Sequence, residues 1–157
     1  MLIAVLACAL DQASKLWLLF VYDLGARGAV KILPVLDFVL IWNTGISYGL
    51  LQQNGPLGQW ALLAFKVIAV ALLWIWLARA GSRLVALSLG LIIGGAIGNA
   101  IDRLVHGAVA DFVLFHVHAG SINFNWYVFN LADAAIVAGV AGLLYDSLAF
   151  GSAAKAP

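Results

Sequence analysis

The chain has 157 residues, of which 65% are hydrophobic and only 10% are charged, and its formal net charge is +1. An ordinary soluble domain carries about 25% charged residues. Together with a mean hydropathy of +1.07, this composition excludes such a domain and predicts an integral membrane protein. The eight basic residues are scattered, which argues against a nucleic-acid-binding surface. The single cysteine, Cys8, excludes an intramolecular disulfide and a cysteine-based zinc site.

Four apolar segments are long enough to cross a bilayer as helices, since a span takes about 20 residues. They cover residues 2–22, 57–78, 84–104 and 126–148. The third segment carries glycines at every fourth position, Gly90, Gly94 and Gly98. Small residues at this spacing let helix backbones approach closely, so we assign these glycines to helix packing.

Two segments between the spans, 30–42 and 109–117, are rich in β-branched and aromatic residues. This composition favours strands. The predicted fold class is therefore a mainly α integral membrane protein, with four transmembrane helices and a small extracytoplasmic β-sheet platform. We expect a single integral-membrane domain over residues 1–157, with outer segments at 23–56 and 105–125.

The orientation of the spans follows from their basic residues. The turn at 79–83 is short and contains two arginines. Because short cytoplasmic loops carry an excess of Lys and Arg, we place this turn and both termini in the cytoplasm. The two outer segments then lie on the opposite side of the membrane.

Two aspartates, Asp111 and Asp133, each stand in a short apolar stretch. A carboxylate in or beside a membrane span is costly and usually faces a protein interior or a wet cavity. With a helix entering at Trp126, Asp133 lies about 10 Å along the helix axis. The outer segment returns to the same membrane face, so we expect both aspartates to share one site. Paired carboxylates can divide acid and base roles between them.

Other polar residues also stand inside or at the ends of the predicted spans. Asp11 and Lys15 are four residues apart and share one helix face, which indicates an internal ion pair that can also brace a site. We also expect the polar residues at the ends of the third and fourth spans to support a site: Asn99, Asp102, Arg103 and Asn130.

Metal and serine chemistry are weaker alternatives. His116 and His118 have a spacing at which two side chains of a strand face the same way, but the chain lacks the zinc-binding motif H-E-x-x-H. Ser14 and Ser47 lack a convincing base partner. We therefore expect neither a metal nor a cofactor.

With these residues laid out, the chain resembles the lipoprotein signal peptidases (signal peptidase II), aspartyl proteases of the bacterial inner membrane. The resemblance extends from the first span to the last. It is carried by five blocks in order: Asp11-Gln12-Ala13-Ser14-Lys15, Asn43-Thr44-Gly45-Ile46-Ser47-Tyr48-Gly49, Gly98-Asn99-Ala100-Ile101-Asp102-Arg103, Val109-Ala110-Asp111-Phe112 and Phe129-Asn130-Leu131-Ala132-Asp133.

This resemblance implies a set of site residues. Asp111 and Asp133 are expected to be the catalytic pair, one activating a water and the other protonating the leaving amine. Eight further residues of the blocks are expected to bind substrate or support the site: Asn43, Gly45, Asn99, Arg103, Asn130, Asp11, Lys15 and Asp102.

The resemblance also implies partners and a location. The substrate is expected to be a prolipoprotein signal peptide with a diacylglyceryl cysteine, cut just before that cysteine and cradled by residues 30–42 and the stretch around 43–56. Membrane lipid is the second expected partner. The protein is expected to be a monomer of the bacterial inner membrane, with its site at the periplasmic face, and to be inhibited by globomycin-type cyclic peptides.

Two other classes of protein remain open on the residues alone. A small transporter or proton channel would use Asp11, Lys15 and Asp133 as relay groups, although four short spans show no inverted repeat of broken helices. A membrane scaffold would need only the glycine packing, and it leaves both aspartate motifs unexplained.

Overall fold

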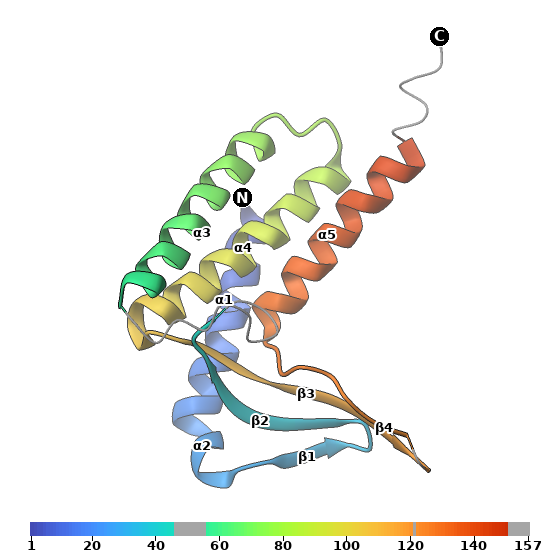
Figure 1. Ribbon diagram of the computed structural model, residues 1–157. Coiled ribbons are helices and arrows are strands. Elements are labelled where there is room, and N and C mark those ends of the chain that lie inside the picture. The colour runs from blue at the N-terminus through green and yellow to red at the C-terminus, as the bar shows by residue number, and fades with distance from the viewer. Residues whose placement is uncertain (46–55, 121, 151–157) are drawn as a thin grey trace.

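The computed structural model describes residues 1–45, 56–120 and 122–150. The helices are α1 (Leu2–Leu16), continued by the π-helical turn η1 (Trp17–Val21), the short α2 (Leu24–Arg27), α3 (Pro56–Leu77), α4 (Arg83–His106) and α5 (Leu131–Phe150). The strands are β1 (Val30–Leu33), β2 (Leu36–Asn43), β3 (Val109–Ala119) and β4 (Ile122–Asn125). The long helices form a bundle, and the sheet lies at one end of it (Figure 1).

The distribution of side chains is that of a membrane protein. Within the described residues, three helical segments are long and apolar enough to cross a membrane, Leu2–Val21, Arg83–His106 and Leu131–Phe150, and Val67–Leu77 of α3 adds a shorter apolar stretch. Large apolar side chains such as Leu148, 80% exposed, cover the outside, whereas charged Lys15 is only 2% exposed. Helices that are apolar outside and polar inside suit a lipid environment, as the composition predicts.

Close contacts at glycines place α4 between α1 and α5. A Cβ atom on Gly94 would collide with the backbone carbonyl of Ala4 in α1. One on Gly95 would collide with the carbonyl of Ala132 in α5. The glycines of α4 therefore serve helix packing, as their spacing predicts.

The ends of α4 fix where its polar residues lie. At its start, the Ser82 hydroxyl accepts from the Val85 N–H at 3.0 Å and donates to Asp146 of α5 at 2.9 Å. At its end, Gly107 adopts a left-handed conformation (φ 72°) and its N–H bonds the Arg103 carbonyl, a common helix-terminating arrangement. The chain then enters β3 at once, so the last turns of α4 lie beside the sheet.

The sheet is antiparallel throughout, in the order β1-β2-β3-β4. Asp111 of β3 pairs with Ile41 of β2, and Asn43 at the end of β2 pairs with Val109. The sheet packs against η1 and α2 around Leu18 and Phe112. This packing holds the end of β2 and the start of β3 against the bundle.

Helix α5 begins at Leu131, later than the predicted entry at Trp126. The apolar run before it is extended, because the Trp126 N–H donates to the Phe115 carbonyl at 2.8 Å and Phe129 pairs with Val113 of β3. Asp133 consequently lies in the first turn of α5. The predicted depth of about 10 Å along the helix is therefore wrong.

We predict that Gly95→Ala destabilises the protein, because the new methyl group would push α5 away from α4. Overpacking of this kind costs about 1–3 kcal/mol, which a thermal unfolding curve in detergent would detect. Gly81→Ala is the matched control, since a Cβ there meets no described atom within 4 Å. Equal melting temperatures for the two variants would contradict the close packing of α4 on α5.

Candidate active site

The first carboxylate of the site, Asp111 in β3, is 2% exposed. Both of its oxygens accept hydrogen bonds from side-chain amides. Asn130 donates to Oδ1 at 2.6 Å, and Asn43 at the end of β2 donates to Oδ2 at 3.0 Å. The antiparallel register of β2 on β3 is what brings Asn43 to Asp111.

The second carboxylate, Asp133, is half-buried in the first turn of α5. Its Oδ2 accepts from the backbone N–H of Asn130 at 3.3 Å, and its own N–H donates to the Asn130 side chain at 3.0 Å. This reciprocal pattern is the arrangement of a capping box, which satisfies N–H groups that a helix start leaves unpaired. Its Oδ1 accepts from the Asn99 amide at 2.8 Å.

Two amide side chains, Asn99 and Asn130, connect the carboxylates, and their orientations are fixed. The Asn130 oxygen accepts from a backbone N–H, so its NH₂ group must point toward Asp111. That NH₂ group also donates to the Asn99 oxygen at 3.0 Å. The Asn99 oxygen further accepts from the Lys15 ammonium at 3.2 Å, which can only donate. The Asn99 NH₂ group is therefore directed at Asp133.

Burial raises the pKa of Asp111 from 3.8 to about 6. The negative charge of Asp133 adds to this rise, because a nearby like charge disfavours ionisation. The amides of Asn43 and Asn130 act in the opposite direction. Asp111 therefore holds a proton at pH values where an ordinary aspartic acid has lost it.

A buried ion cluster of Asp11, Lys15 and Asp102 supports both carboxylates. The Lys15 ammonium lies 2.7 Å from Oδ2 of Asp11 and 2.9 Å from Oδ2 of Asp102. Asp11 also accepts the backbone N–H of Ala132 in α5 at 2.9 Å, and Asp102 accepts that of Ala110 in β3 at 3.1 Å. The cluster thus fixes the start of each element that bears an aspartate of the pair.

Gln12 is a member of this network to which sequence reasoning assigned no role. Its amide NH₂ donates to Oδ1 of Asp102 at 2.9 Å and to the Gly98 carbonyl at 3.0 Å, and it lies 3.3 Å from Oδ2 of Asp11. Its position next to Asp11 inside an apolar span was the available signal.

Arg103 joins the site to the segment after β2. Its guanidinium donates to the Gly45 carbonyl and, at 3.4 Å, to the Asn99 carbonyl. The Gly45 N–H in turn donates to the Asn43 side chain at 3.0 Å. Gly45 therefore takes part through its backbone, and Arg103 holds that backbone beside Asp111.

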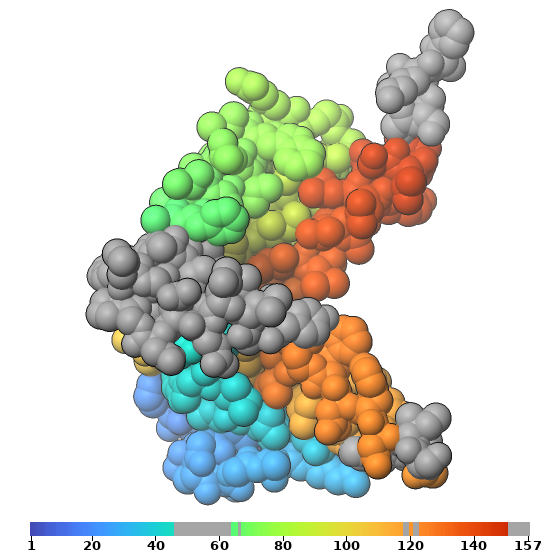
Figure 2. All heavy atoms as spheres, viewed as in Figure 1, coloured from blue at the N-terminus to red at the C-terminus, as the bar shows by residue number. Residues whose placement is uncertain are grey.

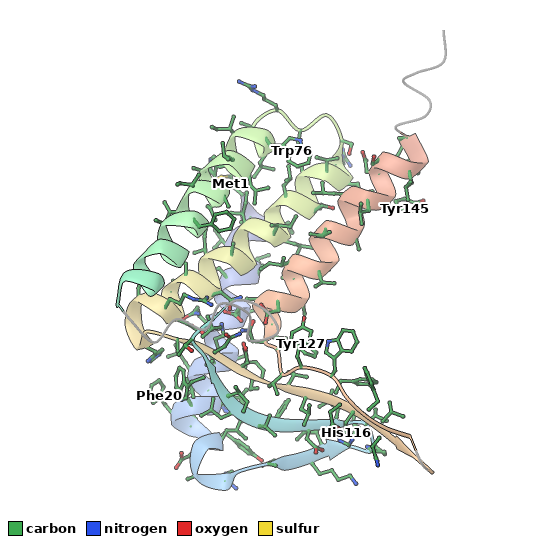
Figure 3. The ribbon with its side chains drawn as sticks, in the orientation of Figure 1. Met1, Phe20, Trp76, His116, Tyr127 and Tyr145 are labelled. Carbon is green, nitrogen blue, oxygen red and sulfur yellow. The ribbon has the colours of Figure 1, made fainter. Side chains whose placement is uncertain are left out.

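Every residue that the sequence proposes for the site falls into this one network, at the junction of bundle and sheet where nitrogen and oxygen atoms gather in Figure 3. His116 lies elsewhere, 3.2 Å from Asp37 of β2. Residues 46–49 of the second block, with Ser47, and most of the predicted cover at 43–56 lie outside the described residues.

The arrangement defines a class of protein. It is a helical membrane protein whose interior holds two carboxylates from different elements, bridged by oriented amides and differing in burial. Such a pair can supply an acid and a base to one reaction.

Comparison with known proteins identifies the family. The family model for Signal peptidase (SPase) II matches residues 3–149. A lipoprotein signal peptidase of Nitrobacter hamburgensis is 64% identical over 154 residues, covering 98% of this chain and 94% of the relative. One of Rhodopseudomonas palustris strain TIE-1 is 58% identical over 156 residues, covering 99% and 95%. The chain belongs to the signal peptidase II family and is a peptidase.

Solved structures show the same fold. A bacterial membrane enzyme determined by the in meso method at 2.3 Å resolution superposes with a TM-score of 0.75, at 24% identity over 99% of this chain and 91% of that one. A second, at 1.9 Å resolution, gives a TM-score of 0.69 at 24% identity over 94% and 90%.

We predict that Lys15→Met strongly destabilises the protein. The substitution leaves Asp11 and Asp102 buried without their cation, and breaking a buried ion pair in this way costs about 3–5 kcal/mol. Thermal unfolding in detergent measures the effect. Lys31→Met in β1 is the matched control because Lys31 is exposed; a Lys15→Met variant as stable as this control would show that the cluster does not hold the bundle together.

Proposed function

We propose that this protein removes the signal peptide from diacylglyceryl-modified prolipoproteins, cutting immediately before the lipidated cysteine, with Asp111 and Asp133 as its catalytic pair. Membership of the signal peptidase II family supports the peptidase chemistry. The name of the relatives, lipoprotein signal peptidase, supports the substrate class. The observation that carries the residue assignment is the bridging of the two carboxylates by Asn99 and Asn130.

In this proposal Asp133 is the base. It lies at the start of α5, where a helix favours negative charge, and it is more exposed than Asp111, so water can reach it. As Asp133 takes a proton from that water, the oxygen attacks the scissile carbonyl carbon. General-base assistance of this kind requires the carboxylate within hydrogen-bond reach of the water.

Asp111 is the acid in this proposal. Its raised pKa, about 6, keeps it protonated at pH values where an ordinary aspartic acid has lost its proton. The protonated carboxyl polarises the carbonyl during attack and then gives its proton to the leaving amine as the peptide C–N bond breaks. The products are the carboxyl end of the signal peptide and the free amine of the lipidated cysteine. The proton on Asp133 then passes to Asp111, directly or through solvent, which restores the pair.

The supporting residues have distinct parts in this scheme. Asn43, Asn99 and Asn130 hold the carboxylate oxygens at set positions. Arg103 and Gly45 keep the end of β2 in place, and Arg103 supplies positive charge beside two carboxylates. The cluster of Asp11, Lys15 and Asp102 positions the backbone of both elements and has no proposed contact with substrate.

The placement in the membrane follows from the same proposal. The chain acts as one membrane protease domain, a monomer of the bacterial inner membrane. Its sheet lies on the periplasmic side, and the turn between α3 and α4 lies on the cytoplasmic side. The site then stands where signal helix, lipid and water meet. A globomycin-type cyclic peptide is the expected inhibitor.

We predict that Asp111→Asn and Asp133→Asn each lower cleavage of a diacylglyceryl prolipoprotein by at least about 10²-fold, the usual contribution of an acid or base. The measurement is turnover by the purified full chain in detergent. Asp23→Asn is the control: Asp23 is exposed and has a positive φ of 53°, a conformation that asparagine tolerates well.

Either variant retaining wild-type turnover would refute the assignment of that aspartate. Wild-type protein that fails to cut a verified lipidated substrate would refute the proposed activity. Melting temperatures recorded alongside separate loss of chemistry from loss of fold.

A further inference from the structure

An apolar groove of about 380 Å³ opens beside Asp133. Its floor is one face of α5, formed by Ala134, Val137, Ala138 and Ala141, and its wall is the aromatic run 126–129 that precedes the helix. Figure 2 shows the surface hollowed between α5 and this run, and Figure 3 places Tyr127 at the start of α5. Asp133 is the acidic residue in its lining.

The groove leads away from the carboxylate pair along the helix. Its floor residues follow Asp133 at intervals of one, four, five and eight positions, so they share a helix face. From Asp133 to Ala141 this face extends about 12 Å at 1.5 Å per residue. Three of the four floor residues are alanines, so only Val137 has a side chain larger than a methyl group.

The size and chemistry of the groove restrict its occupant. One turn of an α-helix with its side chains takes on the order of 400 Å³, so the groove encloses no more than about one turn of a signal helix. An extended peptide would bring N–H and C=O groups into a lining that is almost entirely hydrocarbon, where unpaired polar groups are costly. A single alkyl chain suits this lining, because it carries no group that needs a hydrogen-bond partner.

We propose that this groove binds one acyl chain of the diacylglyceryl group on the substrate cysteine. The inference rests on the proposed function, in which that cysteine lies directly after the bond cut by Asp111 and Asp133. A lipid attached to this cysteine starts beside Asp133, where the groove begins. The floor of α5 then guides the chain into the bilayer, so the groove selects for lipidated over unmodified substrate.

The test is Ala138→Leu, which narrows the middle of the groove, assayed on two prolipoproteins that differ only in acyl length, hexadecanoyl or butanoyl. We expect the KM for the long-chain substrate to rise about tenfold, the usual effect of lost fit in an apolar pocket. The KM for the short-chain substrate and both kcat values stay near wild type. The control is Ala149→Leu, the same change at an exposed α5 position outside the groove. It leaves KM and kcat for both substrates at their wild-type values.

Other results would overturn the inference. An equal rise in KM for both substrates would assign the groove to the signal peptide. An unchanged KM for both would show that the groove has no role in binding. Wild-type protein that cleaves neither substrate would refute the proposed function itself, which is a distinguishable outcome because it appears before any groove variant is made.

A second measurement does not depend on the fold of a groove variant. A substrate with a photoreactive group in the middle of one acyl chain is bound to the Asp111→Asn variant, which does not consume it, and the adduct is mapped by mass spectrometry. We expect labelling within residues 134–141. Labelling confined to α1 or α3 would overturn the inference.

Discussion

The structure depends on three charges, those of Asp11, Lys15 and Asp102, held together inside a bundle of apolar helices. Removing each of these groups from water costs several kcal/mol, and only close pairing with full hydrogen bonding offsets that cost. Here each carboxylate also accepts a backbone N–H group, that of Ala132 in α5 for Asp11 and that of Ala110 in β3 for Asp102. The Gln12 amide donates to the other oxygen of Asp102. One helix and one strand, distant in sequence, are thereby fixed to the same point of α1 and α4.

The consequence for the aspartate pair is geometric. Asp133 follows Ala132 directly, and Asp111 follows Ala110, so each aspartate stands one residue beyond a backbone group that the cluster holds. Lys15 also fixes the amide of Asn99, which contacts Asp133. A charge cluster can in this way set the separation and hydrogen bonding of the two aspartates that we propose to be catalytic. The pair is then asymmetric, with Asp111 buried in strand β3 and Asp133 half-buried at the start of α5.

The sequence predicts the ion pair and the aspartate pair, because a charged residue in an apolar segment has few explanations. Asp11 with Lys15, and Asp111 with Asp133, stand out against neighbours that are almost all hydrocarbon. The start of α5 was misplaced because Trp126 to Phe129 is as apolar as a helix span, and only the pairing of Phe129 with Val113 shows that it is extended.

Other features need three-dimensional contacts. The orientation of the Asn99 amide follows from a lysine 84 positions away. The role of Gln12 follows from the approach of α4, which Gly98 permits: a Cβ there would lie 2.5 Å from the Asp11 carboxylate. The sequence does not predict the groove along α5, because alanines that line a groove cannot be told from alanines that pack against another helix.

The measurement that tests this account most directly is the ionisation of Asp111, followed by infrared or NMR spectroscopy of ¹³C-carboxyl-labelled aspartate in the full chain, with Asp111→Asn to assign the signal. Because burial and the charge of Asp133 both raise its pKa, the carboxyl should lose its proton as the pH rises through about 6. In Asp133→Asn the midpoint should fall, since one of these causes is removed. A midpoint at the ordinary value of 3.8, or one that Asp133→Asn leaves unchanged, would contradict a coupled acid–base pair.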